Sequence, residues 1–274
     1  MALAGVQRAA RLGGIAIARH RDCPLDFDEV TQATHQRISR YSLVSPERTF
    51  ALCSSLEYLE RCAVPGDIVE CGVWKGGSMM AAALTLDQIG SRGRDLWLFD
   101  TFEGMTQPVD VDVDILGNTA HLAMKQRHAS LLPGRVAGRD VFAYASLDEV
   151  RSNMGKVAYK GGEVHYVVGP VEETIPHTIP STIALLRLDT DFYESTKHEL
   201  ENLLPLVAPG GILIVDDYGA WQGARKAVDE YLVESKLPLF LNRIDVTGRL
   251  AVIGCPESEA KLEGRTRPDE EALS

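Results

Sequence analysis

Three aspartates in the second half of the chain have the type and spacing expected of a metal site. Asp189 follows the apolar stretch 183–188, and Asp216 and Asp217 follow the apolar stretch 211–215. If these stretches are neighbouring parallel strands, the three carboxylates converge at one edge of a sheet and repel each other. A divalent cation relieves that repulsion, and oxygen ligands favour Mg²⁺, with Mn²⁺ as a substitute.

A simpler interpretation of the same aspartates stays open. Asp189 and Asp217 can cap helices while Asp216 is solvated, and no cation is then needed. Asp191 stands in the same turn as Asp189 and is a reserve ligand or base.

A second stretch predicts a cofactor site. Residues 68–71 form a short run that is typical of a strand buried on both faces, and a glycine turn and a helix start follow it. Gly72 allows a sharp turn close to a ligand, and the N–H groups at the helix start attract anionic groups. Glu70 can accept hydrogen bonds at the end of the strand. Asp100 ends the next apolar run, where an acid can reach the ribose hydroxyls of an adenosine.

The glycine turn does not match a dinucleotide fingerprint. That motif reads G-x-G-x-x-G, whereas Val73 and Trp74 stand where the second glycine should be. An NAD-dependent oxidoreductase is therefore disfavoured, and an ordinary strand-turn-helix unit without a ligand is the other alternative.

The elements that must position these residues follow an alternating order. Apolar strand patterns cover 68–71, 95–100, 163–169, 183–189 and 211–217, and the two stretches 237–241 and 250–254 can form an antiparallel edge pair. Helical patterns lie between them, at 79–84, 146–154, 194–206 and 221–234, and Ser45 with Pro46 starts a helix before the first strand. This order predicts an α/β fold, a mostly parallel seven-stranded sheet with helices on both faces.

The chain divides into three expected parts. Residues 1–62 form an N-terminal helical arm and lid, 63–256 form the main domain, and 257–274 form a charged tail. The long insertion 101–159 is the expected substrate cap. Within it, the acidic stretch 110–114 lacks the glycine and the final Glu of an EF-hand loop, so we expect a solvated loop. The segment 41–45 can close over the cofactor as a lid, or it can be a packing connector.

Composition limits the class of protein. The 274 residues carry a net charge of −11, which argues against a nucleic-acid groove and against an anionic membrane surface. The five cysteines lack metal-ligand spacing and are expected to be reduced, which favours the cytoplasm. The apolar piece 15–18 is too short to span a membrane. Helices outside the sheet pattern need a surface to pack on, so we expect a homo-oligomer.

Four ordered motifs together resemble the macrocin O-methyltransferase family. They are Glu70–Ser78 (ECGVWKGGS), Asp100–Gly104 (DTFEG), Leu188–Asp191 (LDTD) and Val215–Tyr218 (VDDY), and the resemblance covers about residues 40 to 253. It implies the Rossmann-like fold of class I methyltransferases and S-adenosylmethionine as methyl donor. The cofactor contacts that we expect are Val44, Ser45, Glu70, Cys71, Gly72, Val73, Trp74, Ser78, Asp100, Thr101, Phe102, Gly104 and Ser146.

The resemblance also assigns the aspartates. Residues that match Asp189, Asp216 and Asp217 bind Mg²⁺ in the family, and the one that matches Asp189 is also the proposed base. Catechol-type relatives carry a lysine at the position of Phe192, so a lysine base is not available there.

The expected reaction is metal-dependent methylation of a small-molecule hydroxyl. A cation lowers the pKa of a bound hydroxyl, which makes the oxygen a better nucleophile. A sugar hydroxyl of a natural product or glycan is the first expected acceptor, and a phenol or catechol is the second. A noncatalytic binding protein on the same fold is disfavoured because all three aspartates are present. The cap carries no motif that chooses among these acceptors.

Overall fold

A computed structural model describes residues 26–122, 124 and 143–254 of the chain. The expected arm before residue 26, a large part of the substrate cap, the tail from residue 257, Cys23 and Cys255 therefore lie outside the described residues.

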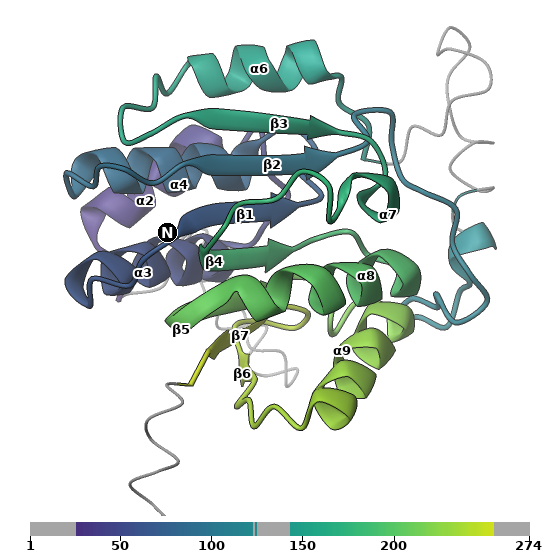
Figure 1. The fold of residues 1–274 in the computed structure, drawn as a ribbon. Coiled ribbons are helices and arrows are strands. Elements are labelled where there is room, and N and C mark those ends of the chain that lie inside the picture. Colours follow the sequence, from purple (N-terminus) through teal and green to yellow (C-terminus); the bar gives the residue numbers. More distant parts are fainter. Residues whose placement is uncertain (1–25, 123, 125–142, 255–274) are drawn as a thin grey trace, which may run out of the picture.

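The described residues form one seven-stranded sheet in the order β3-β2-β1-β4-β5-β7-β6. Neighbouring strands among β1 to β5 pair in parallel, whereas β7 pairs antiparallel with both β5 and β6. The arrowheads of β1 to β4 point the same way in Figure 1, so their carboxyl ends share one edge. The strands are β1 (Asp67–Cys71), β2 (Leu96–Asp100), β3 (Val164–Val168), β4 (Ile183–Leu188), β5 (Val207–Val215), β6 (Asn242–Arg243) and β7 (Arg249–Val252). This order confirms the expected mostly parallel sheet with an antiparallel edge.

Helices cover both faces of the sheet (Figure 1). On one face lie α2 (Glu29–Ile38), α3 (Pro46–Arg61), α4 (Gly77–Gln88) and α6 (Leu147–Gly155), and on the other lie α7 (Val171–Thr174), α8 (Tyr193–Leu203) and α9 (Gln222–Ser235). The predicted start of α3 is confirmed, because the Ser45 hydroxyl accepts a hydrogen bond from the Arg48 N–H at 3.2 Å and Pro46 opens the helix.

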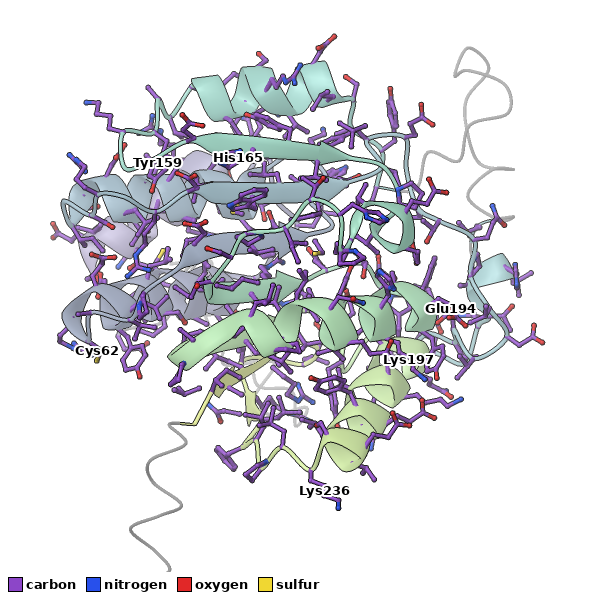
Figure 2. All side chains as sticks on the ribbon, in the orientation of Figure 1. Cys62, Tyr159, His165, Glu194, Lys197 and Lys236 are labelled. Carbon is purple, nitrogen blue, oxygen red and sulfur yellow. The ribbon has the colours of Figure 1, made fainter. Side chains whose placement is uncertain are left out.

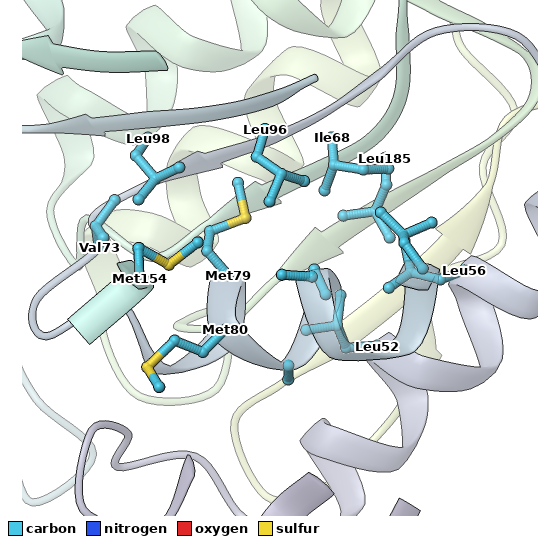
Figure 3. Close-up of a cluster of buried hydrophobic side chains, with 14 of the residues drawn as sticks. Leu52, Leu56, Ile68, Val73, Met79, Met80, Leu96, Leu98, Met154 and Leu185 are labelled. Atoms are coloured by element: carbon cyan, nitrogen blue, oxygen red, sulfur yellow. The ribbon is translucent and has the colours of Figure 1, made fainter. Parts of the chain in front are cut away.

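The hydrophobic core has one layer on each side of the sheet. Ile68 and Val69 are adjacent in β1, belong to opposite layers and are both buried, as expected for a strand covered on both faces. In the layer shown in Figure 3, Met79 of α4 and Leu52 of α3 lie on the same side of the sheet, below Leu96 of β2. The helices of residues 26–62 thus pack into the same hydrophobic core as the sheet. The expected boundary after residue 62 divides the sequence but not this core.

Two strand boundaries differ from the sequence-based expectation. Strand β5 begins at Val207 and not at residue 211, because the backbone continues in the sheet through Pro209 and Gly210, whose N–H donates to the Ile253 carbonyl at 2.8 Å. The stretch 237–241 is not a strand. Its leucines pack against the core as a loop, and the two residues of β6 form the edge instead.

The acidic stretch 110–114 is not simply a solvated loop. Asp112 is fully buried, and its carboxylate accepts hydrogen bonds from the N–H groups of Tyr193 at 2.9 Å and Val109 at 2.8 Å. It caps α8, whose own N-cap residue, Phe192, makes no side-chain cap bond. Figure 2 shows Glu194 and Lys197 on α8, the helix that Asp112 caps. The prediction was wrong here because one of the two donors that Asp112 satisfies, the Tyr193 N–H, lies 81 residues away in the sequence.

Candidate active site

A cavity of about 510 Å³ opens at the carboxyl ends of the parallel strands. Its size lies in the range of small-molecule sites. Most of the expected site residues line it, namely Val44, Glu70, Gly72, Val73, Trp74, Ser78, Asp100, Thr101, Gly104, Asp189, Asp216 and Asp217. The fold therefore brings the expected cofactor turn and the three aspartates to one cavity.

Four expected cofactor contacts lie just outside the lining of this cavity. Ser45 and Ser146 are the N-caps of α3 and α6, where their hydroxyls accept backbone N–H groups. Cys71 is fully buried on the α8 side of the sheet, and Phe102 packs into the core beside α4 and α6.

The turn after β1 touches the turn after β4 through the backbone. Gly72 has φ +81, and a Cβ added there would lie 2.0 Å from the Asp189 carbonyl oxygen. The Asp189 N–H in turn donates to the Cys71 carbonyl at 2.9 Å. Only glycine fits this position, because the backbone is left-handed and the neighbour against it is backbone. The cofactor turn and Asp189 thus have a fixed relative position.

Asp100 organises the loop that follows β1. Its Oδ2 accepts the N–H groups of Val73 at 2.7 Å and Trp74 at 3.0 Å, and its Oδ1 accepts that of Phe102 at 2.8 Å. Burial raises the pKa of Asp100, and these N–H bonds oppose the rise. The Thr101 hydroxyl lies 3.4 Å from Oδ1, but its one proton goes to the nearer Gly104 carbonyl at 2.5 Å. The three N–H donors therefore leave about one of the four acceptor positions of the carboxylate for a ligand.

Glu70 is a buried carboxylate with a free oxygen. It is 2% exposed, and Oε1 pairs with Arg187, while Oε2 has no hydrogen-bond partner among the described residues. Burial raises the pKa of Glu70 to about 7, although Arg187 opposes the rise. Helix α4 begins beside it without a side-chain cap, so its first N–H groups are open. A ligand that carries both an ammonium and a carboxylate group, as S-adenosylmethionine does, fits this pair of features.

The three aspartates meet as predicted. One carboxylate oxygen from each of Asp189, Asp216 and Asp217 lies within 4.8 Å of the others, the one such group of three or more metal-type side chains in the described parts of the chain. Burial raises the pKa values of Asp189 and Asp217 well above the usual range, and neighbouring acids add to the rise. The donor set is all oxygen and fits a hard divalent cation.

Two arginines that the sequence analysis did not single out also belong to this cluster. Arg187 is 4% exposed and contacts Glu70, Asp189 Oδ2 at 2.8 Å and Asp216 Oδ1 at 2.8 Å. The contact between Arg187 Nη2 and Asp216 Oδ1 has poor hydrogen-bond geometry, so neither of these two atoms has a hydrogen-bond partner among the described residues. Arg48 of α3 contacts the other oxygen of Asp216. Two guanidinium groups thus offset part of the charge of the four carboxylates, and the formal charge left over matches one divalent cation.

Asp191 lies beside the three aspartates and contacts Trp221 and Asp217. The Trp221 indole N–H donates to Asp191 Oδ1 at 2.7 Å, and the Asp191 N–H donates to Asp217 Oδ2 at 3.3 Å. Burial first, and then the charge of Asp189, raise the pKa of Asp191 to about 7. Phe192, at the position of the lysine of catechol-type relatives, packs edge-on against Trp221 with ring centroids 5.4 Å apart.

The sequence was compared with protein families and with curated proteins. The family model described as "Macrocin-O-methyltransferase (TylF)" matches residues 18–250. The chain belongs to this family. It is 31% identical over 238 residues, with 84% of this chain and 85% of the relative covered, to an 8-demethyl-8-(2,3-dimethoxy-alpha-L-rhamnosyl)-tetracenomycin-C 4'-O-methyltransferase of Streptomyces olivaceus. It is 34% identical, with 70% and 71% covered, to a demethyldecarbamoylnovobiocin O-methyltransferase of Streptomyces niveus.

A solved structure supports the same assignment. The O-methyltransferase NovP superposes with a TM-score of 0.66 at 30% identity, covering 78% of this chain and 83% of that chain. The macrocin O-methyltransferase family member described here is therefore an S-adenosylmethionine-dependent O-methyltransferase with a class I fold. In the part of the chain that the structure describes, no helix is long and apolar enough to cross a membrane.

Proposed function

We propose that this methyltransferase methylates a sugar hydroxyl of a natural product and that Asp189, Asp216 and Asp217 hold a Mg²⁺ or Mn²⁺ ion. The observation that carries the proposal is the backbone contact between Gly72 and Asp189. It joins the cofactor turn to the carboxylate cluster on one cavity. A methyl donor and a hydroxyl acceptor bound there would lie side by side, and positioning of this kind is a large part of the catalysis of such transfers.

The cofactor half of the site offers three kinds of contact. Glu70 Oε2 accepts a hydrogen bond from the ammonium group of S-adenosylmethionine, which supplies the buried oxygen with its missing partner. The open N–H groups of α4 receive the carboxylate. Asp100 uses its remaining acceptor position for a ribose hydroxyl. Val44 lines the same cavity and belongs to the segment 41–45 that we propose as the lid.

In the acceptor half, Asp189 receives the proton of the hydroxyl. The side chain of Asp189 is 29% exposed and that of Asp216 is 3% exposed, so Asp189 is the more accessible. Arg187 occupies Oδ2, which leaves the two acceptor positions of Oδ1, one for the cation and one for the proton. A bound cation supplies Lewis acidity, which lowers the pKa of the hydroxyl enough for a weakly basic carboxylate to act.

The acceptor proposal draws on the names of the relatives. The three curated relatives are named for tetracenomycin, novobiocin and mycinamicin substrates, and the name of the first includes a rhamnosyl group. A sugar hydroxyl on a natural product is the acceptor that fits this set best.

The test is methyl transfer from S-adenosylmethionine to a panel of glycosylated natural products and phenols, read by mass spectrometry. We expect a methylated sugar, loss of the reaction with EDTA and recovery with Mg²⁺. Methylation of phenols alone would contradict the acceptor, and full activity in EDTA would contradict the cation. Calorimetry with S-adenosylmethionine and NAD on the same sample should show heat for the first only.

A further inference from the structure

Arg48 links three parts of the molecule that are far apart in the sequence. It stands in the first turn of α3, and its Nε donates to Asp245 Oδ2 at 2.8 Å. Its two other nitrogens contact Asp216 and the Thr247 hydroxyl. Arg48 therefore ties the start of α3 to the carboxylate cluster and to the turn between β6 and β7.

Asp216 is paired with arginine on both of its oxygens. Oδ1 faces Arg187 and Oδ2 faces Arg48, and the side chain of Asp216 is only 3% exposed. A cation that uses an Asp216 oxygen would come close to one of these two guanidinium groups and be repelled by it. Arg187 is the less mobile of the two, because it is 5% exposed at its side chain and also holds Glu70 and Asp189. Arg48, at 19% side-chain exposure, is the group that can withdraw.

The segment 41–45 is anchored through the same contacts. The Ser45 hydroxyl donates to Asp245 Oδ2 at 2.8 Å, so Ser45 and Arg48 share one carboxylate oxygen. Burial tends to raise the pKa of Asp245, but hydrogen bonds from the Gly248 N–H and from these two side chains hold this pKa at about 2. Residues 41–44 line the cavity. A movement of Arg48 is thereby transmitted to the wall of the cavity next to the cofactor turn.

We propose that Arg48 is a positioning residue that couples the cation site to the segment 41–45. Arg48 and the divalent cation compete for Asp216, so cation binding loosens the hold of Arg48 and changes the mobility of the segment. By linkage, the Arg48 pair weakens cation binding to the same extent as the cation weakens the pair. This inference rests on the cation site of the proposed function.

The experiment measures Mn²⁺ binding to the full chain by loss of the free-ion electron paramagnetic resonance signal, without cofactor or acceptor. In Arg48→Met we expect the Mn²⁺ affinity to rise roughly tenfold, because a competing positive charge is removed. Arg92→Met is the matched control. It removes the same charge from an exposed arginine in the loop after α4 that pairs with Asp87 at 3.9 Å, so the affinity should stay within about twofold.

Hydrogen exchange of the amides in residues 41–48 gives the second readout. In the wild type, Mn²⁺ should speed their exchange about threefold, and in Arg48→Met the exchange should be fast with or without Mn²⁺. Asp245→Asn keeps the charge of Arg48 and weakens its link to Ser45. It should lose the Mn²⁺-dependent change in exchange, because Asp245 Oδ2 is the atom that Ser45 and Arg48 share.

The outcomes separate this inference from the proposed function. If wild type and Arg48→Met bind Mn²⁺ equally well, the coupling is wrong and the cation site stands. If neither binds Mn²⁺, the cation site and the coupling fall together. If Arg48→Met does not fold, the comparison of wild type with Asp245→Asn still tests the coupling. A Mn²⁺-dependent change in hydrogen exchange that persists in Asp245→Asn would overturn it.

Discussion

Asp189 combines two properties that the other two aspartates of the cluster lack. Its backbone rests on the cofactor turn, and its side chain is the more open to the cavity, whereas Asp216 is enclosed by two arginines. We therefore assign the proton-accepting role to Asp189 and a mainly ligating role to Asp217.

Asp189→Asn should lose at least about a hundredfold in turnover, because the amide keeps the shape and one ligand oxygen but cannot accept the proton. Excess Mg²⁺ should not restore activity, and calorimetry should show unchanged S-adenosylmethionine binding. Asp217→Asn is the control, since its activity should recover in part as Mg²⁺ is raised. Equal rescue of both variants would contradict the distinct role of Asp189.

The aspartates could be predicted from the sequence because each directly follows an apolar run, and strand ends at one edge of a parallel sheet converge. Arg187 had a usable signal, since it is the one charged residue inside the apolar run 183–188. A buried arginine needs carboxylate partners, so its position pointed to the cluster. Arg48 had no such signal. It looks like a surface residue of a helix, and its partners Asp216 and Asp245 come from the other end of the chain.

At the scale of elements, the first turn of α8 depends on a cap from a distant loop. Asp112→Ala should lower the free energy of unfolding by about 1–3 kcal/mol, because it removes a fully buried carboxylate and leaves the part-buried N–H groups of Tyr193 and Val109 without acceptors. Urea unfolding measures this effect. Asp114→Ala removes a carboxylate from the same stretch and should cost less, because the hydrogen bonds that it breaks are exposed. An equal cost for both variants would argue against the capping role.

The sequence predicted elements better than their limits. The N-cap of α3, Ser45 before Pro46, was predicted from local residue types and is confirmed. For α6 the helix at 146–154 was predicted, and the structure makes Ser146 its N-cap. The start of β5 was missed because the Pro209–Gly210 pair reads as a turn, while the sheet holds it through a hydrogen bond from the Gly210 N–H to Ile253. Local residue types fix where a helix begins, but pairing with a distant strand decides how far a strand extends.

At the scale of the whole molecule, the buried acids set the pH dependence of stability. Glu70 and Asp191 have pKa values of about 7 in the fold, above their ordinary values of 4.5 and 3.8. Between about pH 4 and pH 7 the folded state binds more protons than the unfolded state. The free energy of unfolding is therefore highest below about pH 4 as far as these two acids are concerned, and it falls as the pH rises through 7.

The ligand-free enzyme should therefore unfold at a lower temperature at pH 8 than at pH 5, by the equivalent of on the order of 2 kcal/mol. Thermal scans by circular dichroism check this, and the difference should shrink in Asp191→Asn. Mg²⁺ should also reduce the difference between pH 5 and pH 8, because a bound cation neutralises the negative charge that protons otherwise neutralise. A melting temperature that rises toward pH 8 would contradict the assigned pKa directions.

The homo-oligomer stays a prediction at this scale. Light scattering of the full chain should give a mass of at least two copies of 30.0 kDa. A monomer at micromolar concentration would contradict the predicted homo-oligomer without affecting the assignment of the site.

The backbone contact between Gly72 and Asp189 also has a consequence for biosynthesis. Gly72 directly follows β1, which ends at Cys71, whereas Asp189 directly follows β4, which spans Ile183–Leu188. A ribosome delivers the chain from the N-terminus, so β1, β2 and β3 exist for some time without the strand that belongs beside β1. The three aspartates of the carboxylate cluster are absent from the cavity in that period. Until β4 pairs with it, one edge of β1 is exposed, and this edge is the vulnerable surface of the newly made protein.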